Sequence, residues 1–161
     1  MSGPGPVDAV NPAVTCADPQ AARLVATAYD VIRQRYAEGR HQIGAAIIAA
    51  DGKVYCGIHV EAMVGRYSIC AEMAALAAAR LYTRQPLMAV AAVRYPKPSE
   101  AGGARIVSPC GGCREVLLDH APQIQAVVPQ GEHGVFAPLH TLLPVKYVGT
   151  KWAAQLPTQT P

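Results

Sequence analysis

The stretch IGAAIIAADGKVYCGIHV, residues 43–60, decides the fold of this chain. Residues 43–50 form a short continuous apolar run, which is typical of a strand that is covered on both faces. Asp51-Gly52 is a two-residue hairpin signal, so we expect the chain to return as an antiparallel strand over residues 54–60. A sheet that is covered on both faces needs helices on both sides, and the flanking sequence supplies them.

Helical patterns lie on either side of this pair of strands. Asp18-Pro19 is typical of a helix start, an N-cap followed by proline at the first helical position, and Gly39 is expected to end that helix. An alanine-rich run over 71–84 predicts a second helix, because its residues have high helix propensity. The further expected elements are strands over 87–94, 105–107 and 124–128, a helix over 110–119 and a short helix over 139–143. This order predicts an α/β protein, a three-layer α/β/α sandwich with a mixed five-stranded sheet.

Three cysteines fall in two short runs that are typical of a metal site, Cys70-Ala71-Glu72 and Pro109-Cys110-Gly111-Gly112-Cys113. Three thiolates can hold a zinc ion and leave its fourth position open for water, which is the arrangement of a catalytic site rather than of a structural one. Both runs fall where a helix is expected to begin, and the free N–H groups of a helix start favour thiolates. The sequence therefore predicts zinc held by Cys70, Cys110 and Cys113, with Glu72 close enough to act as the catalytic proton shuttle.

Length, composition and charge limit the possible domain organisation and partners of the chain. With 161 residues, of which 51% are hydrophobic, the chain is long enough for one domain with a packed core. We expect a disordered leader over residues 1–15, a single zinc-dependent domain over 16–152 and a flexible tail over 153–161. The formal net charge of +3 is not clustered, which argues against nucleic acid as a partner. No apolar run is long enough to span a bilayer, so no membrane association is expected.

The cysteine pattern indicates a reducing compartment. Five cysteines are an odd number, without the dense spacing of a secreted disulfide scaffold. Three of them as metal ligands suit the cytoplasm, where we expect the protein to reside. Cys16 is expected in a flexible segment before the first helix, and Cys56 in the middle of a strand as a small buried apolar residue.

Two other interpretations of the cysteine runs stay open at this point. The run from Cys110 to Cys113 at a helix start also resembles a thiol–disulfide redox motif. A structural zinc site would need a fourth ligand, which His59 or His120 could supply. The position of Glu72 beside a ligand favours the catalytic interpretation over both.

The same runs resemble those of the small, single-domain cytidine deaminases. The resembling segments are Ser68-Ile69-Cys70-Ala71-Glu72 and Val107-Ser108-Pro109-Cys110-Gly111-Gly112-Cys113-Arg114, within a likeness that covers residues 18–148. It implies a cytidine deaminase-like fold with zinc as cofactor, in the all-cysteine version. It also implies a hydrolase that converts a cytidine- or deoxycytidine-like nucleoside to its uridine-type product plus ammonia, as in pyrimidine salvage. Family members are mostly homotetramers whose active sites include residues of neighbouring subunits, and the same is expected here.

The resemblance also assigns roles to individual residues. Glu72 is expected to protonate ring N3, to accept a proton from the zinc-activated water and later to carry a proton to the leaving amino group. Apart from the resemblance, Arg114 is next to Cys113 and offsets part of the thiolate charge if it turns toward a ligand sulfur, and Arg66 in the loop before Cys70 is a candidate to reach a neighbouring subunit's pocket. The implied substrate-binding residues are His41, His59, Glu61, Ala71 and Ser108.

Several of these positions depart from the family pattern. The family usually has Asn-x-Glu at the end of the second strand, with both side chains holding sugar hydroxyls, whereas this chain has His59-Val60-Glu61. Ala62 stands where a second asparagine is common, His41 where an aromatic residue is, and Met73 where an arginine supports the thiolates. A change in the side chains that hydrogen-bond the sugar indicates a change in the sugar or in the group that replaces it. The alternative substrate is therefore a modified cytosine nucleoside antibiotic, as for the related blasticidin S deaminases, or another amino-heterocycle.

Overall fold

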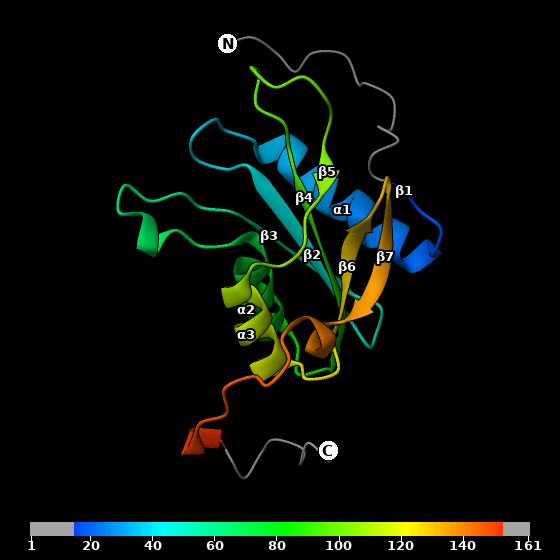
Figure 1. Ribbon diagram of the computed structural model, residues 1–161, viewed down its shortest axis with the longest axis vertical. Coiled ribbons are helices and arrows are strands. Elements are labelled where there is room, and N and C mark those ends of the chain that lie inside the picture. The colour runs from blue at the N-terminus through cyan, green and yellow to red at the C-terminus, as the bar shows by residue number, and fades with distance from the viewer. Residues whose placement is uncertain (1–14, 153–161) are drawn as a thin grey trace.

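The computed structural model describes residues 15–152, which form a mixed sheet with helices on both faces (Figure 1). The helices are α1 (Pro19–Arg35), α2 (Ala71–Tyr82) and α3 (Gly111–His120), with short 3-10 turns η2 (Gly65–Tyr67), η3 (Leu139–Leu142) and η4 (Thr150–Trp152). The strands are β1 (Thr15–Cys16), β2 (Ile43–Ala49), β3 (Val54–Ile58), β4 (Leu87–Arg94), β5 (Arg105–Ile106), β6 (Gln125–Gln130) and β7 (His133–Pro138). The predicted three-layer α/β/α sandwich is confirmed.

The sheet runs in the order β1-β7-β6-β4-β2-β3, and β5 pairs with one end of β4. It is mixed as expected, because β2 is antiparallel to both β3 and β4 whereas β4 and β6 are parallel. The predicted hairpin joins β2 to β3, and Gly52 within it adopts φ +81°, a conformation that glycine tolerates. Within residues 15–152 the sheet has seven strands rather than the expected five, so the predicted strand number is corrected.

The two additional strands, β1 and β7, pair with each other at one edge of the sheet. The sequence of β7 has turn signals, with Gly131 before it and Gly134 and Pro138 inside it, yet the whole strand pairs antiparallel with β6. Cys16 lies in β1 and packs against the core beside α1, so its assignment to a flexible segment was wrong. Thr15, inside the expected leader, also belongs to β1. A two-residue strand such as β1 forms only because it pairs with β7, and no local sequence pattern predicts that pairing.

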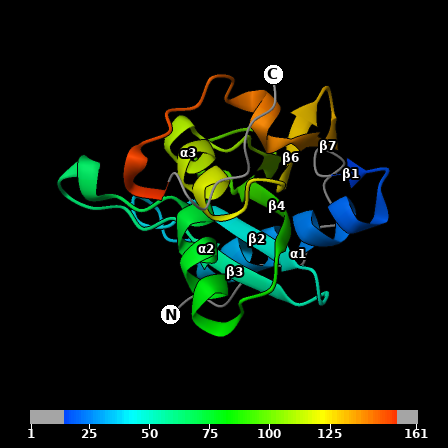
Figure 2. The same ribbon diagram turned by 90° about the horizontal axis from the view of Figure 1, so that it is seen from below.

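α1 covers one face of the sheet, and α2 and α3 cover the other (Figure 2). The side chains of β2 alternate between these two cores. Ala45 and Ile47 pack on the side of α2 and α3, and Ala46 and Ile48 pack on the side of α1. None of the four is more than 3% exposed. This two-sided burial explains why the run is apolar throughout, as the sequence predicted.

α1 begins where the sequence predicts it. The Oδ1 atom of Asp18 accepts hydrogen bonds from the backbone N–H groups of Gln20 (2.8 Å) and Ala21 (3.0 Å), which is the arrangement of an N-cap. The helix ends at Arg35, earlier than the expected Gly39.

α2 lies directly on β3 at Gly57. A Cβ atom at this position would lie 2.2 Å from the backbone N of Ala75 and 2.5 Å from the backbone O of Ala71, closer than real contacts allow. The missing side chain therefore lets the first turns of α2 rest on the strand. This contact fixes the start of α2, where Cys70 and Glu72 are found, against the sheet.

The expected flexible tail over 153–161, and all but the last residue of the expected leader, lie outside the described residues. Within residues 15–152, no helix combines the length and the apolar character that a membrane crossing requires.

Candidate active site

The three predicted zinc ligands lie together where two helices begin. Cys70 and Cys110 are the N-cap residues of α2 and α3, and Cys113 lies in the first turn of α3. α2 and α3 pack side by side, which joins two runs that are far apart in the sequence (Figure 2). The Sγ atom of Cys110 lies 3.7 Å from that of Cys70 and 3.4 Å from that of Cys113, and all three lie within 4.8 Å of one another.

This spacing suits a zinc ion. Zn–S bonds of about 2.3 Å in a tetrahedron separate the sulfur atoms by roughly 3.8 Å, close to the distances between the thiols. Within residues 15–152 no histidine or carboxylate joins this group of three, so neither His59 nor His120 supplies a fourth ligand. A zinc ion held by these thiols therefore keeps one position open, which is the arrangement of a catalytic site.

The three thiols differ in their electrostatic surroundings. Burial acts to raise the pKa of Cys110, but hydrogen bonds from the backbone N–H of Cys113 and from its neighbouring thiols outweigh burial and lower it. Burial raises the pKa of both Cys70 and Cys113. Cys113 is fully buried, whereas Cys110 is exposed. A dication among the sulfurs would favour the deprotonated form of all three.

Glu72 lies beside the thiols and is the only Asp or Glu that is buried among residues 15–152, with 5% of its surface exposed. Burial raises its pKa, and hydrogen bonds from its own backbone N–H and from the thiol of Cys113 lower it by less. A carboxyl group with a raised pKa holds a proton more readily than an exposed one, which suits a group that both accepts and donates protons.

The structure brings together three of the residues that were predicted to bind substrate. His59 Nε2 lies 3.4 Å from Glu61 Oε2, and His41 Nδ1 lies 2.9 Å from the backbone O of His59. The other ring nitrogen of His59, Nδ1, is buried without a hydrogen-bond partner among the described residues. Gly57 faces α2, so the alternation along the strand directs His59, two residues on, to the side of the sheet that carries the thiols.

Ser68, which the sequence did not single out, holds Glu61 in this network. The hydroxyl of Ser68 donates to Glu61 Oε1, and the backbone N–H of Ala62 lies 3.1 Å from Ser68 Oγ and 3.2 Å from Glu61 Oε1. The hydrogen bond from Ser68 is the largest cause of a lowered pKa at Glu61. The contact exists because Val60 and Ile69 pair with each other, which closes the loop between them. No sequence pattern signals that pairing.

The other two predicted substrate-binding residues lie outside the network. Ala71 is the buried first residue of α2, directly after Cys70. Ser108 is exposed in the segment between β5 and Cys110.

Of the two predicted roles for arginine side chains, the one for Arg114 is wrong, and the one for Arg66 toward a neighbouring subunit stays a prediction. Arg114 does not turn toward a sulfur, because its Nε donates to the backbone O of Pro109 and its Nη1 to that of Leu142, both at 2.8 Å. Arg66 is exposed and lies over the ring of Tyr67, with 4.6 Å from its guanidinium carbon to the ring centroid and a hydrogen bond of 2.6 Å to the ring hydroxyl.

Three thiols gathered at two helix starts, on one face of an α/β/α sheet and beside a buried carboxyl group, define a zinc-dependent hydrolytic deaminase. The family model of the cytidine and deoxycytidylate deaminase zinc-binding region matches residues 18–129. The chain belongs to this family, as its motifs predicted. It is a deaminase with zinc as cofactor.

Individual relatives agree with this assignment. The blasticidin-S deaminase of Bacillus cereus is 34% identical over 125 residues, which cover 77% of this chain and 89% of that protein. The cytidine deaminase of Mycobacterium tuberculosis strain H37Rv is 36% identical over 81 residues, which cover 50% of this chain and 56% of that protein. The crystal structure of cytidine deaminase from Mycobacterium tuberculosis has a TM-score of 0.65 at 26% identity, covering 81% of this chain and 99% of the other.

Proposed function

We propose that this chain removes the 4-amino group of a cytosine nucleoside by hydrolysis, giving the uracil nucleoside and ammonia. The observation that carries the proposal is the group of three thiols within 4.8 Å of one another, next to the buried carboxyl group of Glu72. Cys70, Cys110 and Cys113 are the proposed zinc ligands. When bound, zinc supplies a Lewis acid that makes water acidic enough to ionise near neutral pH.

Glu72 is the proposed proton carrier. Its carboxylate accepts a proton from the attacking water and delivers it to ring N3 of the cytosine. It then passes the second proton of the water to the 4-amino group, so that ammonia leaves as the carbonyl forms. The raised pKa that burial gives Glu72 supports this role, because a shuttle must exchange protons readily in both directions. The backbone at Ala71 and the side chain of Ser108 are proposed to contact the base.

The sugar side of the substrate is proposed to meet His41, His59 and Glu61. Both carboxylate oxygens of Glu61 already have protein partners, Ser68 and the backbone of Ala62 on Oε1 and His59 on Oε2. The carboxylate is thus held in one orientation, with lone pairs remaining for a ligand hydroxyl or another donor.

A cytosine nucleoside antibiotic is the second candidate substrate. The histidine–glutamate pair formed by His59 and Glu61 differs from the asparagine–glutamate pair that the cytidine deaminases usually carry. The chain also covers 89% of the blasticidin-S deaminase of Bacillus cereus, against 56% of the cytidine deaminase of Mycobacterium tuberculosis. The changed pair favours a ligand whose sugar is modified, and the similarity to a blasticidin-S deaminase supports an antibiotic as that ligand.

Ammonia release from cytidine, deoxycytidine and blasticidin S tests the proposal. We expect turnover of at least one of the three, lost when a chelator removes zinc and restored when zinc is returned. A kcat/KM that is higher for blasticidin S than for cytidine would assign the antibiotic as the substrate, and the reverse order would assign cytidine. No ammonia from any of the three contradicts the proposal. A zinc-free protein with a reversible Cys110–Cys113 disulfide would favour the redox interpretation instead.

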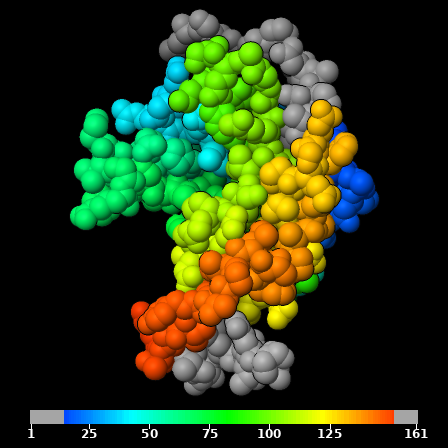
Figure 3. Space-filling view, in the orientation of Figure 1, coloured from blue at the N-terminus to red at the C-terminus, as the bar shows by residue number. Residues whose placement is uncertain are grey.

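We also propose a homotetramer in which a projecting arm, residues 60–69, contacts neighbouring subunits. The ends of the arm are joined by hydrogen bonds between Val60 and Ile69, and the rest stands away from the body of the protein (Figure 3). Its apolar side chains are unusually exposed, with Met63 at 97% and Tyr67 at 62%. Exposed apolar side chains gathered on a projection support a protein–protein contact.

The mass of the native protein in solution tests this assembly. We expect four chains for the unchanged protein and a smaller assembly for Met63→Glu, because a charge would have to be buried in the contact. A single-chain mass for the unchanged protein contradicts the proposal. We further propose a cytoplasmic location, since a site built from three free thiols requires a reducing compartment.

A further inference from the structure

The C-terminal part of the described chain, residues 139–152, forms a strap that lies along α3, the helix that carries two of the three thiols (Figures 1 and 3). Two basic residues anchor the strap to the helix. One is Lys146 within the strap, and the other is Arg114 within α3.

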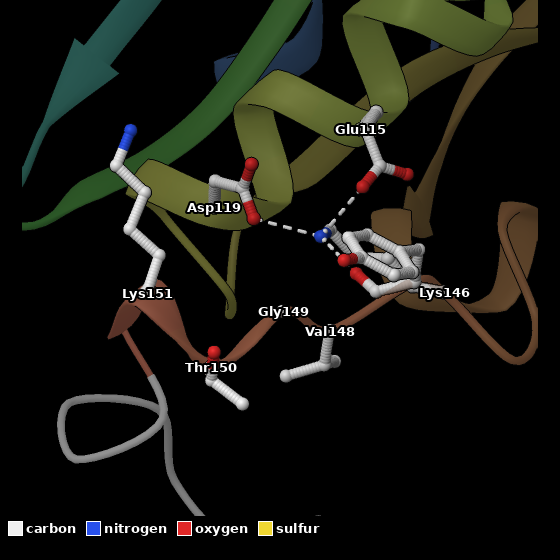
Figure 4. A pocket seen from close by; sticks show the side chains of 8 residues that line it. Glu115, Asp119, Lys146, Val148, Gly149, Thr150 and Lys151 are labelled. Carbon is white, nitrogen blue, oxygen red and sulfur yellow. Dashed lines mark hydrogen bonds and ion pairs between the residues drawn. The ribbon is translucent and has the colours of Figure 1, made fainter.

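Lys146 binds two carboxylates that lie one helical turn apart on α3. Its Nζ atom lies 2.8 Å from Glu115 Oε1 and 2.7 Å from Asp119 Oδ1, and only 10% of its side chain is exposed (Figure 4). Burial acts against the charge of Lys146, but hydrogen bonds from its ammonium to Asp119 and Glu115 outweigh burial and raise its pKa. The pocket around this cluster is lined by α3 and the strap and includes none of the thiols.

The backbone of the strap is strained next to this anchor. Val145 adopts φ +51°, in the left-handed region that β-branched residues avoid. Strain of this kind costs about 1–3 kcal/mol and persists only where the surroundings impose it. The side chain of Val145 is 97% exposed, so packing does not compensate for the strain. Val145 lies between the two anchored residues of the strap, Leu142 and Lys146.

Arg114 links the strap to the segment that leads to Cys110. One guanidinium donates both to the backbone O of Pro109 and to the backbone O of Leu142, each at 2.8 Å. Because the guanidinium is planar and rigid, it fixes these two carbonyl groups relative to each other. Pro109 directly precedes Cys110, so the strap and the thiol-bearing segment are held together by one side chain.

Cys110 needs such support more than the other two thiols do. Cys113 is fully buried in the core, and Cys70 is half-buried, whereas Cys110 is exposed. Its sulfur is also the one within 3.7 Å of Cys70 and 3.4 Å of Cys113. A small displacement of the segment before α3 would therefore break the spacing of the whole group.

We propose that Arg114 is a positioning residue for zinc binding, which holds Cys110 in place by fastening the Pro109 carbonyl to the strap. The inference rests on the proposed zinc ligands. Groups that orient metal ligands in this way typically contribute 10–100-fold to metal affinity. The strap thereby supports the zinc site.

Arg114→Lys tests the proposal, because lysine keeps the charge but has no planar pair of donors. We expect zinc affinity, measured by competition with a chromophoric chelator, to fall about 10–100-fold. The matched control is Arg80→Lys. Arg80 forms the same type of link, donating to the backbone O of Gln85 (3.0 Å) and of His120 (2.8 Å), but at the far ends of α2 and α3. We expect this control to lower the unfolding free energy without changing zinc affinity.

A second variant, Lys146→Ala, releases the other anchor of the strap and is expected to weaken zinc binding in the same direction. Zinc affinity that is unchanged in both Arg114→Lys and Lys146→Ala would overturn the proposal. So would an equal loss of affinity in Arg80→Lys, since that would reflect general destabilisation. Cys110→Ser shows whether a negative result rejects the proposed zinc ligands or only the positioning role of Arg114. If it leaves zinc affinity unaltered, the proposed ligands themselves are wrong. If it abolishes zinc binding while Arg114→Lys leaves zinc affinity unchanged, only the positioning role is wrong.

Discussion

Glu72→Gln is expected to lower kcat by about 10²–10⁴-fold and to leave the zinc content unchanged. Glutamine has nearly the shape of glutamate, so the buried space at the start of α2 stays filled. The amide, however, can neither accept a proton from water nor deliver one to the substrate. Because Glu72 is the only buried Asp or Glu among residues 15–152, no neighbouring carboxylate is placed to replace it. Steady-state ammonia release and metal analysis of the same preparation measure both quantities.

Glu132→Gln is the control for this experiment, because Glu132 is exposed in the turn between β6 and β7. We expect turnover by this variant to equal that of the unchanged protein. Turnover near the normal value in Glu72→Gln would reject the assigned role. Loss of zinc in Glu72→Gln would reject it as well, since the carboxylate would then support the metal rather than the chemistry.

Gly57→Ala is expected to destabilise the protein by about 3 kcal/mol or more, at the upper end of the range for overpacked sites. The new Cβ would meet backbone atoms of α2, 2.2 Å from the N of Ala75 and 2.5 Å from the O of Ala71. Backbone atoms cannot rotate away, so the helix itself has to move. Since Cys70 precedes the first turn of α2, the movement would also displace a thiol. The free energy of unfolding from a urea titration measures the first effect, and zinc affinity the second.

Gly65→Ala is the matched control for the substitution at Gly57. Gly65 has no neighbouring atom within 4 Å of the added Cβ and no positive φ, so we expect a change within about 0.5 kcal/mol. A stability loss at Gly57 no larger than that at Gly65 would contradict the close contact between α2 and β3.

The parts of the fold that the sequence predicts are those with a strong local cause. β2 could be predicted because both of its faces are buried, which leaves an uninterrupted apolar run. The start of α1 could be predicted because Asp18 and Pro19 have chemical roles that are specific to a helix start. β7 could not, because Gly134 and Pro138 are turn residues unless a neighbouring strand imposes pairing on them. β1 depends in the same way on β7.

In the candidate site, too, the sequence predicts the residues that belong to a local motif and not those that depend on distant contacts. The thiols and Glu72 could be predicted because metal ligands and a proton carrier occur as short motifs at helix starts. The contact of Ser68 with Glu61 could not, because it depends on the pairing of Val60 and Ile69 across the arm. The role of Arg114 could not be predicted from the sequence either. Its adjacency to Cys113 suggested a contact with sulfur, but the two carbonyl groups that it binds come together only when the strap lies against α3.

X-ray absorption at the zinc edge of the purified, reduced protein tests the central claim most directly, because it counts the atoms around the ion. For the unchanged chain we predict three sulfur atoms at about 2.3 Å and one oxygen at about 2.0 Å, with one zinc ion per chain. A fourth protein ligand in place of that oxygen, or a folded and active protein without zinc, would contradict the account.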